Sequence, residues 1–134
     1  MPQILLIDDD PNIHKLISVL LKKLDCQLLS ALGGREGEII ALEQKPTLIL
    51  LDIMMPNQDG YETCQHLRHQ GYQGAITMVS ALAEATGTKR AKEYGANGYL
   101  IKPISASLLR LHLDYVAAGM PYPTVTEWLT SQPE

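Results

Sequence analysis

Two apolar runs that each end in an acidic residue constrain the fold of this chain more than any other feature. Residues 4–7 are all leucine or isoleucine and are followed by Asp8, and residues 48–51 are followed in the same way by Asp52. Apolar runs without polar alternation are typical of strands buried on both faces of a parallel sheet. A carboxylate that follows such a strand lies at the carboxyl edge of the sheet, where open α/β folds bind their ligands. The two acids therefore predict a site at that edge.

Apolar spacing and turn residues extend this pattern to five strands that alternate with five helices. The remaining strands are expected at residues 27–31, 76–79 and 98–101. Helices are expected over residues 11–24, 34–45, 60–71, 83–94 and 105–118. They are indicated by apolar residues three and four positions apart and by start and stop residues such as Pro11, Pro46 and Gly95. This order predicts an α/β fold, a doubly wound five-stranded parallel sheet with helices on both faces.

The length and composition are those of one globular domain. Residues 1–118 of the 134 are expected to form it, and residues 119–134 to be a C-terminal tail or the start of a linker. Eleven Lys plus Arg against fifteen Asp plus Glu leave no basic stripe, so nucleic acid is not expected as a direct ligand. Cys26 and Cys64 lack a C-x-x-C partner, and the apolar run near the N-terminus is too short for a signal peptide or a membrane span. We expect a soluble, cytoplasmic protein with reduced thiols.

Four of the five expected strands end in residues that can carry chemistry. Asp8 and Asp9 follow the first strand, Asp52 ends the third, Ser80 follows the fourth and Lys102 the fifth. In a parallel sheet these residues gather at one edge. Two carboxylates about 4 Å apart repel by roughly 4 kcal/mol at an effective dielectric constant near 20, so the cluster favours a bound cation. Its oxygen donors favour Mg²⁺.

Such a pocket has the groups that stabilise a transferring phosphoryl group. A metal ion, an ammonium and a hydroxyl spread positive charge and hydrogen bonds around the phosphoryl oxygens, and Asp52 is the candidate nucleophile. In the alternative interpretation the acids and Ser80 cap helices and Lys102 lies at the surface. That interpretation leaves the shared location of the four strand ends unexplained.

The residues at the strand ends resemble the receiver domain of two-component response regulators, from Gln3 to Ala118. The matching segments are Ile7-Asp8-Asp9-Asp10-Pro11, Leu51-Asp52-Ile53-Met54-Met55-Pro56 with Asp59-Gly60, Ser80-Ala81, Gly95-Ala96 and Tyr99-Leu100-Ile101-Lys102-Pro103. The resemblance implies a flavodoxin-like fold of the receiver type. It also implies that Asp52 accepts a phosphoryl group from the phosphohistidine of a sensor histidine kinase or a phosphotransfer protein.

The resemblance assigns a role to each residue of the pocket. The magnesium ligands that it implies are Asp8, Asp9, Asp52 and the backbone carbonyl of Met54. Ser80 and Lys102 would contact the phosphoryl oxygens, and Ser80 and Tyr99 would be the switch residues. The bond between Lys102 and Pro103 is expected to be cis. Met54 and Leu82, which flank the pocket, offer no polar group to an attacking water, so slow self-dephosphorylation is expected.

Phosphorylation is expected to switch a surface formed by the fourth helix, the fifth strand and the fifth helix, which would bind an effector or a second copy of the chain. Asn97 and His112 stand where the DNA-binding class with a winged-helix output usually has Asp and Arg, which pair between subunits. The standard dimer of that class is therefore in doubt. His14, His66, His69 and His112 are interpreted as surface or packing residues.

Two other functions stay open at this point. One is a Mg²⁺-dependent phosphatase with an aspartyl nucleophile, and the other is a receiver-like scaffold without chemistry. We expect a phosphoacceptor signalling domain rather than an enzyme, with self-catalysed phosphotransfer and dephosphorylation only.

Overall fold

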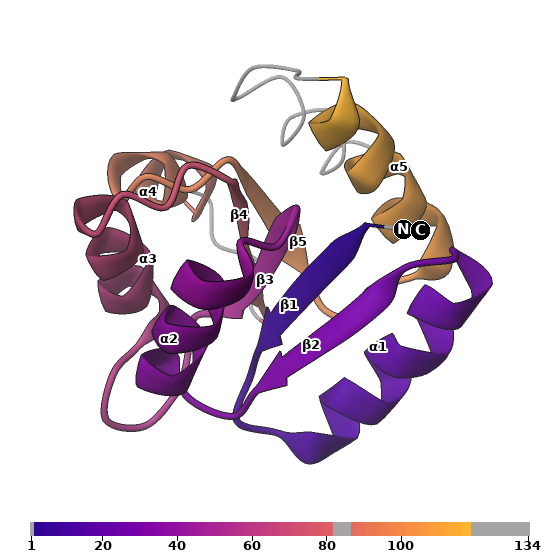
Figure 1. Cartoon of the computed structure of the whole chain (residues 1–134), viewed down its shortest axis with the longest axis horizontal. Coiled ribbons are helices and arrows are strands. Elements are labelled where there is room, and N and C mark those ends of the chain that lie inside the picture. The colour runs from indigo at the N-terminus through magenta and orange to yellow at the C-terminus, as the bar shows by residue number, and fades with distance from the viewer. Residues whose placement is uncertain (1, 82–86, 119–134) are drawn as a thin grey trace.

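The computed structural model of the chain describes residues 2–81 and 87–118 (Figure 1). The first residues of the helix expected over 83–94, the side chain of Leu82 and the expected tail at 119–134 lie outside the described residues. In the described ranges, strands and helices alternate along the chain. They are β1 (Gln3–Ile7), α1 (Pro11–Lys23), β2 (Gln27–Ala31), α2 (Gly34–Gln44), β3 (Leu48–Asp52), α3 (Gly60–His69), β4 (Ala75–Ser80), α4 (Gly87–Glu93), β5 (Gly98–Ile101) and α5 (Ala106–Ala117).

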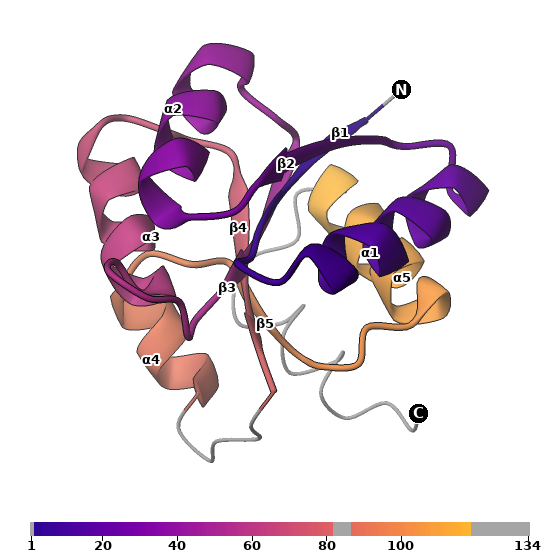
Figure 2. The ribbon, with the colours of Figure 1, turned by 90° about the horizontal axis from the view of Figure 1, so that it is seen from below.

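The strands form one parallel sheet in the order β2-β1-β3-β4-β5. Helices α2, α3 and α4 cover one face of the sheet, and α1 and α5 cover the other (Figure 2). The register places Ile7 beside Leu51 and Asp52 beside Val79, so the carboxyl ends of the three inner strands lie together. The expected α/β class, with a doubly wound five-stranded parallel sheet, is confirmed.

Alternate residues of the inner strands contribute to two separate apolar cores. Leu5, Ile7, Ile49 and Leu51 pack under α2, α3 and α4, whereas Ile4, Leu6, Leu48 and Leu50 pack under α1 and α5. All eight side chains are at most 2% exposed. Burial on both faces is the physical reason why these strands show no polar alternation. Edge strand β2, by contrast, has a mixture of exposed and half-buried residues.

Side-chain caps determine where three of the helices begin. The carboxylate of Asp10 accepts a hydrogen bond from the Asn12 amide at the start of α1, and the hydroxyl of Ser105 accepts one from the Leu108 amide at the start of α5. Both helices begin close to the positions expected from the sequence, residues 11 and 105. Asp59 caps α3 in the same way. The loops that leave β1, β3 and β5 at the carboxyl edge are thereby held at their far ends.

Helix α5 is attached to the sheet through a polar contact as well as through its apolar side chains. Leu109 and His112 are fully buried, and the His112 ring nitrogen Nε2 forms a short hydrogen bond with the hydroxyl of Thr77 in β4. Burial lowers the pKa of His112 to about 4. His112 is therefore a neutral packing residue at neutral pH.

Among the residues that the structure describes, no helix has both the length and the apolar character needed to cross a bilayer.

Candidate functional site

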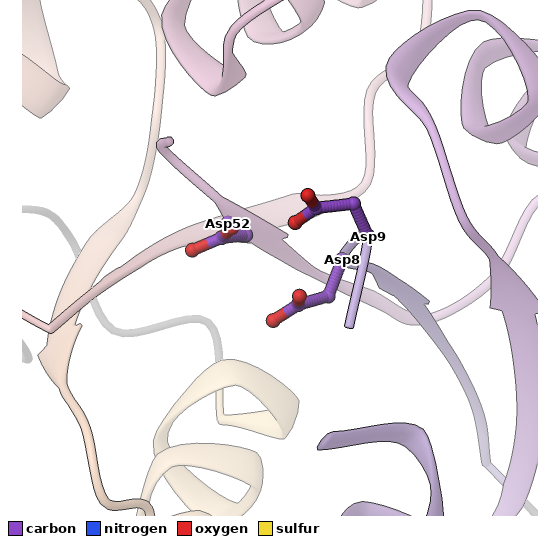
Figure 3. Close-up of side chains that lie close together, drawn as sticks. All are labelled: Asp8, Asp9 and Asp52. Carbon is purple, nitrogen blue, oxygen red and sulfur yellow. The ribbon is translucent and has the colours of Figure 1, made fainter. Parts of the chain in front are cut away.

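Three aspartates gather where β1 and β3 end (Figure 3). Asp8 and Asp9 directly follow β1, and Asp52 is the last residue of the neighbouring strand β3. One carboxylate oxygen from each residue lies within 4.8 Å of the others. Asp8 and Asp52 are 1% and 6% exposed, while Asp9 lies in contact with solvent. The cluster is thus open on the side of Asp9 and closed on the side of the sheet.

The loop after β1 holds Asp8 in place through its own hydrogen bonds. The amide of Asp10 donates to Asp8 Oδ1 at 2.9 Å, and the ring nitrogen Nε2 of His14 in α1 donates to the backbone carbonyl of Asp8 at 2.7 Å. The contact of His14 could not be predicted from the sequence, because a histidine one turn into an amphipathic helix shows no pattern of its own. His14 therefore supports the loop without joining the carboxylates.

Lys102 brings a positive charge into this cluster from β5. Its Nζ lies 3.0 Å from Asp8 Oδ2 and 3.2 Å from Asp52 Oδ1. Its backbone amide donates to the carbonyl of Ser80 at 2.8 Å, which joins the ends of β5 and β4. Burial disfavours the ammonium, but the hydrogen bonds and charges of Asp8 and Asp52 outweigh it and raise the pKa of Lys102. The ammonium is therefore charged at neutral pH.

One ammonium does not balance the negative charge of the cluster. Burial, followed by the charge of Asp8, raises the pKa of Asp52 to about 6, although Lys102 acts in the opposite direction. A carboxylate whose pKa is raised by a like charge gains from a further cation. The donors are hard carboxylate oxygens within reach of a single ion, so the residues present fit Mg²⁺.

The remaining expected site residues occupy different parts of the fold. Ser80 ends β4 one position beyond Val79, which pairs with Asp52, and it is 4% exposed. Tyr99 in β5 is 2% exposed and belongs to the apolar core under α2, α3 and α4. Met54 follows β3, and its side chain is 69% exposed. The bond between Lys102 and Pro103 is cis, as expected.

The geometry thus collects the expected pocket at one edge of the sheet. Contacts join Asp8 and Asp52 to Lys102, and Ser80 lies at the end of the adjacent strand. Tyr99 lies within the core, as a packing residue would. The arrangement can bind a cation beside a buried carboxylate and place an ammonium next to both, which suits the chemistry of a phosphoryl group.

Comparisons with known proteins agree with this geometry. Residues 4–114 match the family model of the response regulator receiver domain. The chain is 38% identical over 105 residues to the DNA-binding dual master transcriptional regulator RpaA of Synechocystis sp., a match that covers 77% of this chain and 44% of RpaA. It is also 31% identical over 121 residues to protein PilH of Pseudomonas aeruginosa. That match covers 89% of this chain and 100% of PilH.

A solved structure shows the same architecture. The chemotaxis protein CheY4 of Vibrio cholerae aligns with a TM-score of 0.80 and 27% identity, over 87% of this chain and 98% of CheY4. The chain spans about half the length of the curated transcriptional regulators that it matches. The family match includes β1 from Ile4 onward, the other four strands and the acidic cluster. The chain therefore belongs to the family of response regulator receiver domains, which act as phosphoacceptors in signalling.

Proposed function

We propose that Asp52 is the phosphoacceptor, and that it receives the phosphoryl group from the phosphohistidine of a sensor histidine kinase or a phosphotransfer protein. The observation that carries the proposal is a nearly buried carboxylate at the end of β3, with Lys102 Nζ at 3.2 Å and two further carboxylates beside it. Such a carboxylate lies at the edge of the sheet and is surrounded by the groups that phosphoryl transfer requires.

The transfer is a displacement at phosphorus. A carboxylate oxygen of Asp52 attacks the phosphorus atom, the O–P bond forms as the P–N bond to the donor imidazole breaks, and the electron pair of that bond stays on the imidazole nitrogen. Lys102 and the hydroxyl of Ser80 stabilise the charge on the phosphoryl oxygens. Asp52 reacts in its ionised form.

Asp8, Asp9, Asp52 and the backbone carbonyl of Met54 would hold Mg²⁺. The bound ion supplies positive charge that neutralises the phosphoryl oxygens and keeps Asp52 ionised. Asp8 and Asp9 take no part in bond formation. Their role is to bind the ion, and that of His14 and the Asp10 amide is to hold Asp8 in position.

The output surface is proposed to consist of the described parts of α4, β5 and α5, with Ser80 and Tyr99 as switch residues. Asn97, just before β5, accepts hydrogen bonds from Arg68 and from the Ile76 amide within the chain. His112 in α5 is bonded to Thr77. Because both residues are engaged inside the domain, we propose that an effector or a second copy binds this surface through other side chains.

Labelling with acetyl phosphate tests the phosphoacceptor. The parent protein with Mg²⁺ is expected to gain one phosphoryl group by intact-mass measurement, and Asp52→Asn is expected to gain none. Asp10→Asn is the matched control, because asparagine also caps a helix and Asp10 contributes only its backbone amide to Asp8. Equal labelling of Asp52→Asn and the parent, or labelling that EDTA does not reduce, would contradict the proposal.

The same samples separate the proposal from its two alternatives. A phosphatase with an aspartyl nucleophile would turn over a small phosphate ester many times per protein molecule, and a scaffold would not be labelled at all. A signalling phosphoacceptor is expected to give one label per molecule and no sustained turnover.

A further inference from the structure

A buried polar network outside the acidic cluster ties the β3–α3 loop, residues 53–59, to helix α2. Its centre is Glu38 of α2, an acidic residue that is only 8% exposed. Three side chains converge on it: Gln58 Nε2 from the loop and His66 Nδ1 from α3 contact Oε2, and Gln70 Nε2 contacts Oε1. A buried carboxylate needs such partners, since leaving it without them is costly.

Gln58 makes a second hydrogen bond that orients its amide group. Its Nε2 lies 2.8 Å from the hydroxyl of Thr63, which itself donates to the backbone carbonyl of Asp59 at 3.0 Å. A Cβ atom on Gly34 would lie 2.2 Å from the Thr63 hydroxyl and 2.8 Å from Gln58 Nε2. The glycine at the start of α2 therefore lets that helix come close enough for Glu38 to reach Gln58.

The loop that Gln58 anchors is also the one that leaves Asp52. At its base the Gly60 amide donates to the Ile53 carbonyl at 2.8 Å, and near its tip the Gln58 amide donates to the Pro56 carbonyl at 2.8 Å. Between these two points lies Met54, whose side chain is 69% exposed. The side chain of Met54 therefore does little to hold its own backbone in place.

We propose that Gln58 is a positioning residue for the metal site: its hydrogen bond to Glu38 fixes the backbone of the β3–α3 loop, which carries the Met54 carbonyl that would bind the ion. This inference rests on the proposed function. Fixing the backbone of a loop before an ion binds removes an entropic cost that would otherwise oppose binding. Groups that orient metal ligands from outside the coordination sphere typically change metal affinity by about tenfold to a hundredfold.

Magnesium titration calorimetry on matched variants tests the proposal. Gln58→Leu keeps a similar side-chain size but removes the hydrogen bonds of Gln58 to Glu38 and Thr63. Gln70→Leu removes another donor to the Glu38 carboxylate, from a residue outside the loop. Both variants are expected to lose stability in urea unfolding, but only Gln58→Leu is expected to bind Mg²⁺ about tenfold more weakly. Amide exchange without metal is expected to be faster over residues 53–60 in Gln58→Leu alone.

A second pair covers the case in which Gln58→Leu does not fold. Gly34→Ala pushes a methyl group against Gln58 and Thr63 and is expected to weaken Mg²⁺ binding, whereas Gly33→Ala, where nothing lies within 4 Å, is expected to leave it unchanged.

Each outcome has one meaning. Parental Mg²⁺ affinity in Gln58→Leu, or equal weakening in Gln70→Leu, overturns the positioning role and leaves the proposed function standing. A parent protein that binds no Mg²⁺, or an Asp52→Asn variant that binds it as the parent does, overturns the proposed metal site and the positioning role together.

Discussion

Two buried groups, Asp52 and His112, are expected to make the stability of the domain depend on pH in opposite directions. Burial and the charge of Asp8 raise the pKa of Asp52 from its ordinary value of 3.8 to about 6, and burial lowers the pKa of His112 from 6.5 to about 4. The two residues are 6% and 0% exposed. Their titrations therefore overlap between about pH 4 and pH 6.

The sign of each contribution depends on which state binds more protons. In the overlapping range, Asp52 is protonated in the folded domain and ionised in the unfolded chain, so its contribution to the free energy of unfolding increases as the pH falls. His112 is neutral in the folded domain and protonated in the unfolded chain, so its contribution decreases. Each pKa differs by roughly two pH units between the folded and unfolded states, which corresponds to a change of about 3 kcal/mol in the free energy of unfolding over the full titration. In the parent protein the two contributions nearly cancel.

When either residue is substituted, the pH dependence contributed by the other is expected to remain. It is measured as the free energy of unfolding in urea, with EDTA, between pH 4 and pH 6.5. As the pH falls through 5, Asp52→Asn is expected to lose about 1 kcal/mol per pH unit relative to the parent, and His112→Leu to gain about 1 kcal/mol per pH unit. The free energy of unfolding of the double variant is expected to change with pH as that of the parent does. Carboxylates far from Asp52 and His112 contribute equally to all four proteins, so the differences in slope report these two groups together with the charged neighbours of Asp52.

Parallel slopes for the parent and Asp52→Asn would refute the raised pKa of Asp52, and parallel slopes for the parent and His112→Leu would refute the lowered pKa of His112. Mg²⁺ is an internal check in the parent. A bound ion keeps Asp52 ionised, so saturating Mg²⁺ is expected to bring the slope of the parent to that of Asp52→Asn.

Two further substitutions test the loop that follows Asp52. Gly60→Ala places a Cβ atom 2.3 Å from the backbone oxygen of Asp52, so urea unfolding is expected to show a loss of about 1–3 kcal/mol. Gly33→Ala meets no atom within 4 Å but puts a less favourable residue at the N-cap of α2, so a smaller loss of about 0.5 kcal/mol is expected. Equal losses would contradict this. Met54→Asn offers a polar group to the water that attacks the phosphoaspartate, so labelled protein is expected to lose its phosphoryl group about tenfold faster in an intact-mass time course. Slower loss than in the parent would show that Met54 does not border the path of that water.

The strands and the acidic cluster could be predicted because one physical cause produces both signals. A strand buried on both faces must be apolar throughout, so the position where the apolar run stops, at Asp8 or Asp52, is also the position where the strand reaches the edge of the sheet. Parallel pairing then places these ends together. The location of the site followed from the fold without any knowledge of individual contacts.

The long-range polar contacts of the fold could not be predicted, because they join residues that are far apart in sequence and carry no local pattern. The Arg68 guanidinium in α3 donates to the carbonyls of Tyr72, Gly74 and Gly95 and to the side chain of Asn97. A sequence shows only an arginine near the end of a helix, which is usually a solvated residue. The hydrogen-bond network of Glu38 and the buried hydrogen bond of His112 could not be predicted for the same reason.

The site is completed by a residue that is synthesised well after its three acids. Lys102 is separated from Asp8 by 94 residues and from Asp52 by 50 residues along the sequence. Contacts of such long sequence separation are slow to form, because the cost of closing the intervening loop precedes the gain from the contact. A chain that emerges from the ribosome therefore presents its three acids well before the strand that carries the balancing ammonium. Until β5 pairs with β4, a nascent receiver has the carboxylates of the site without the cation that holds two of them together.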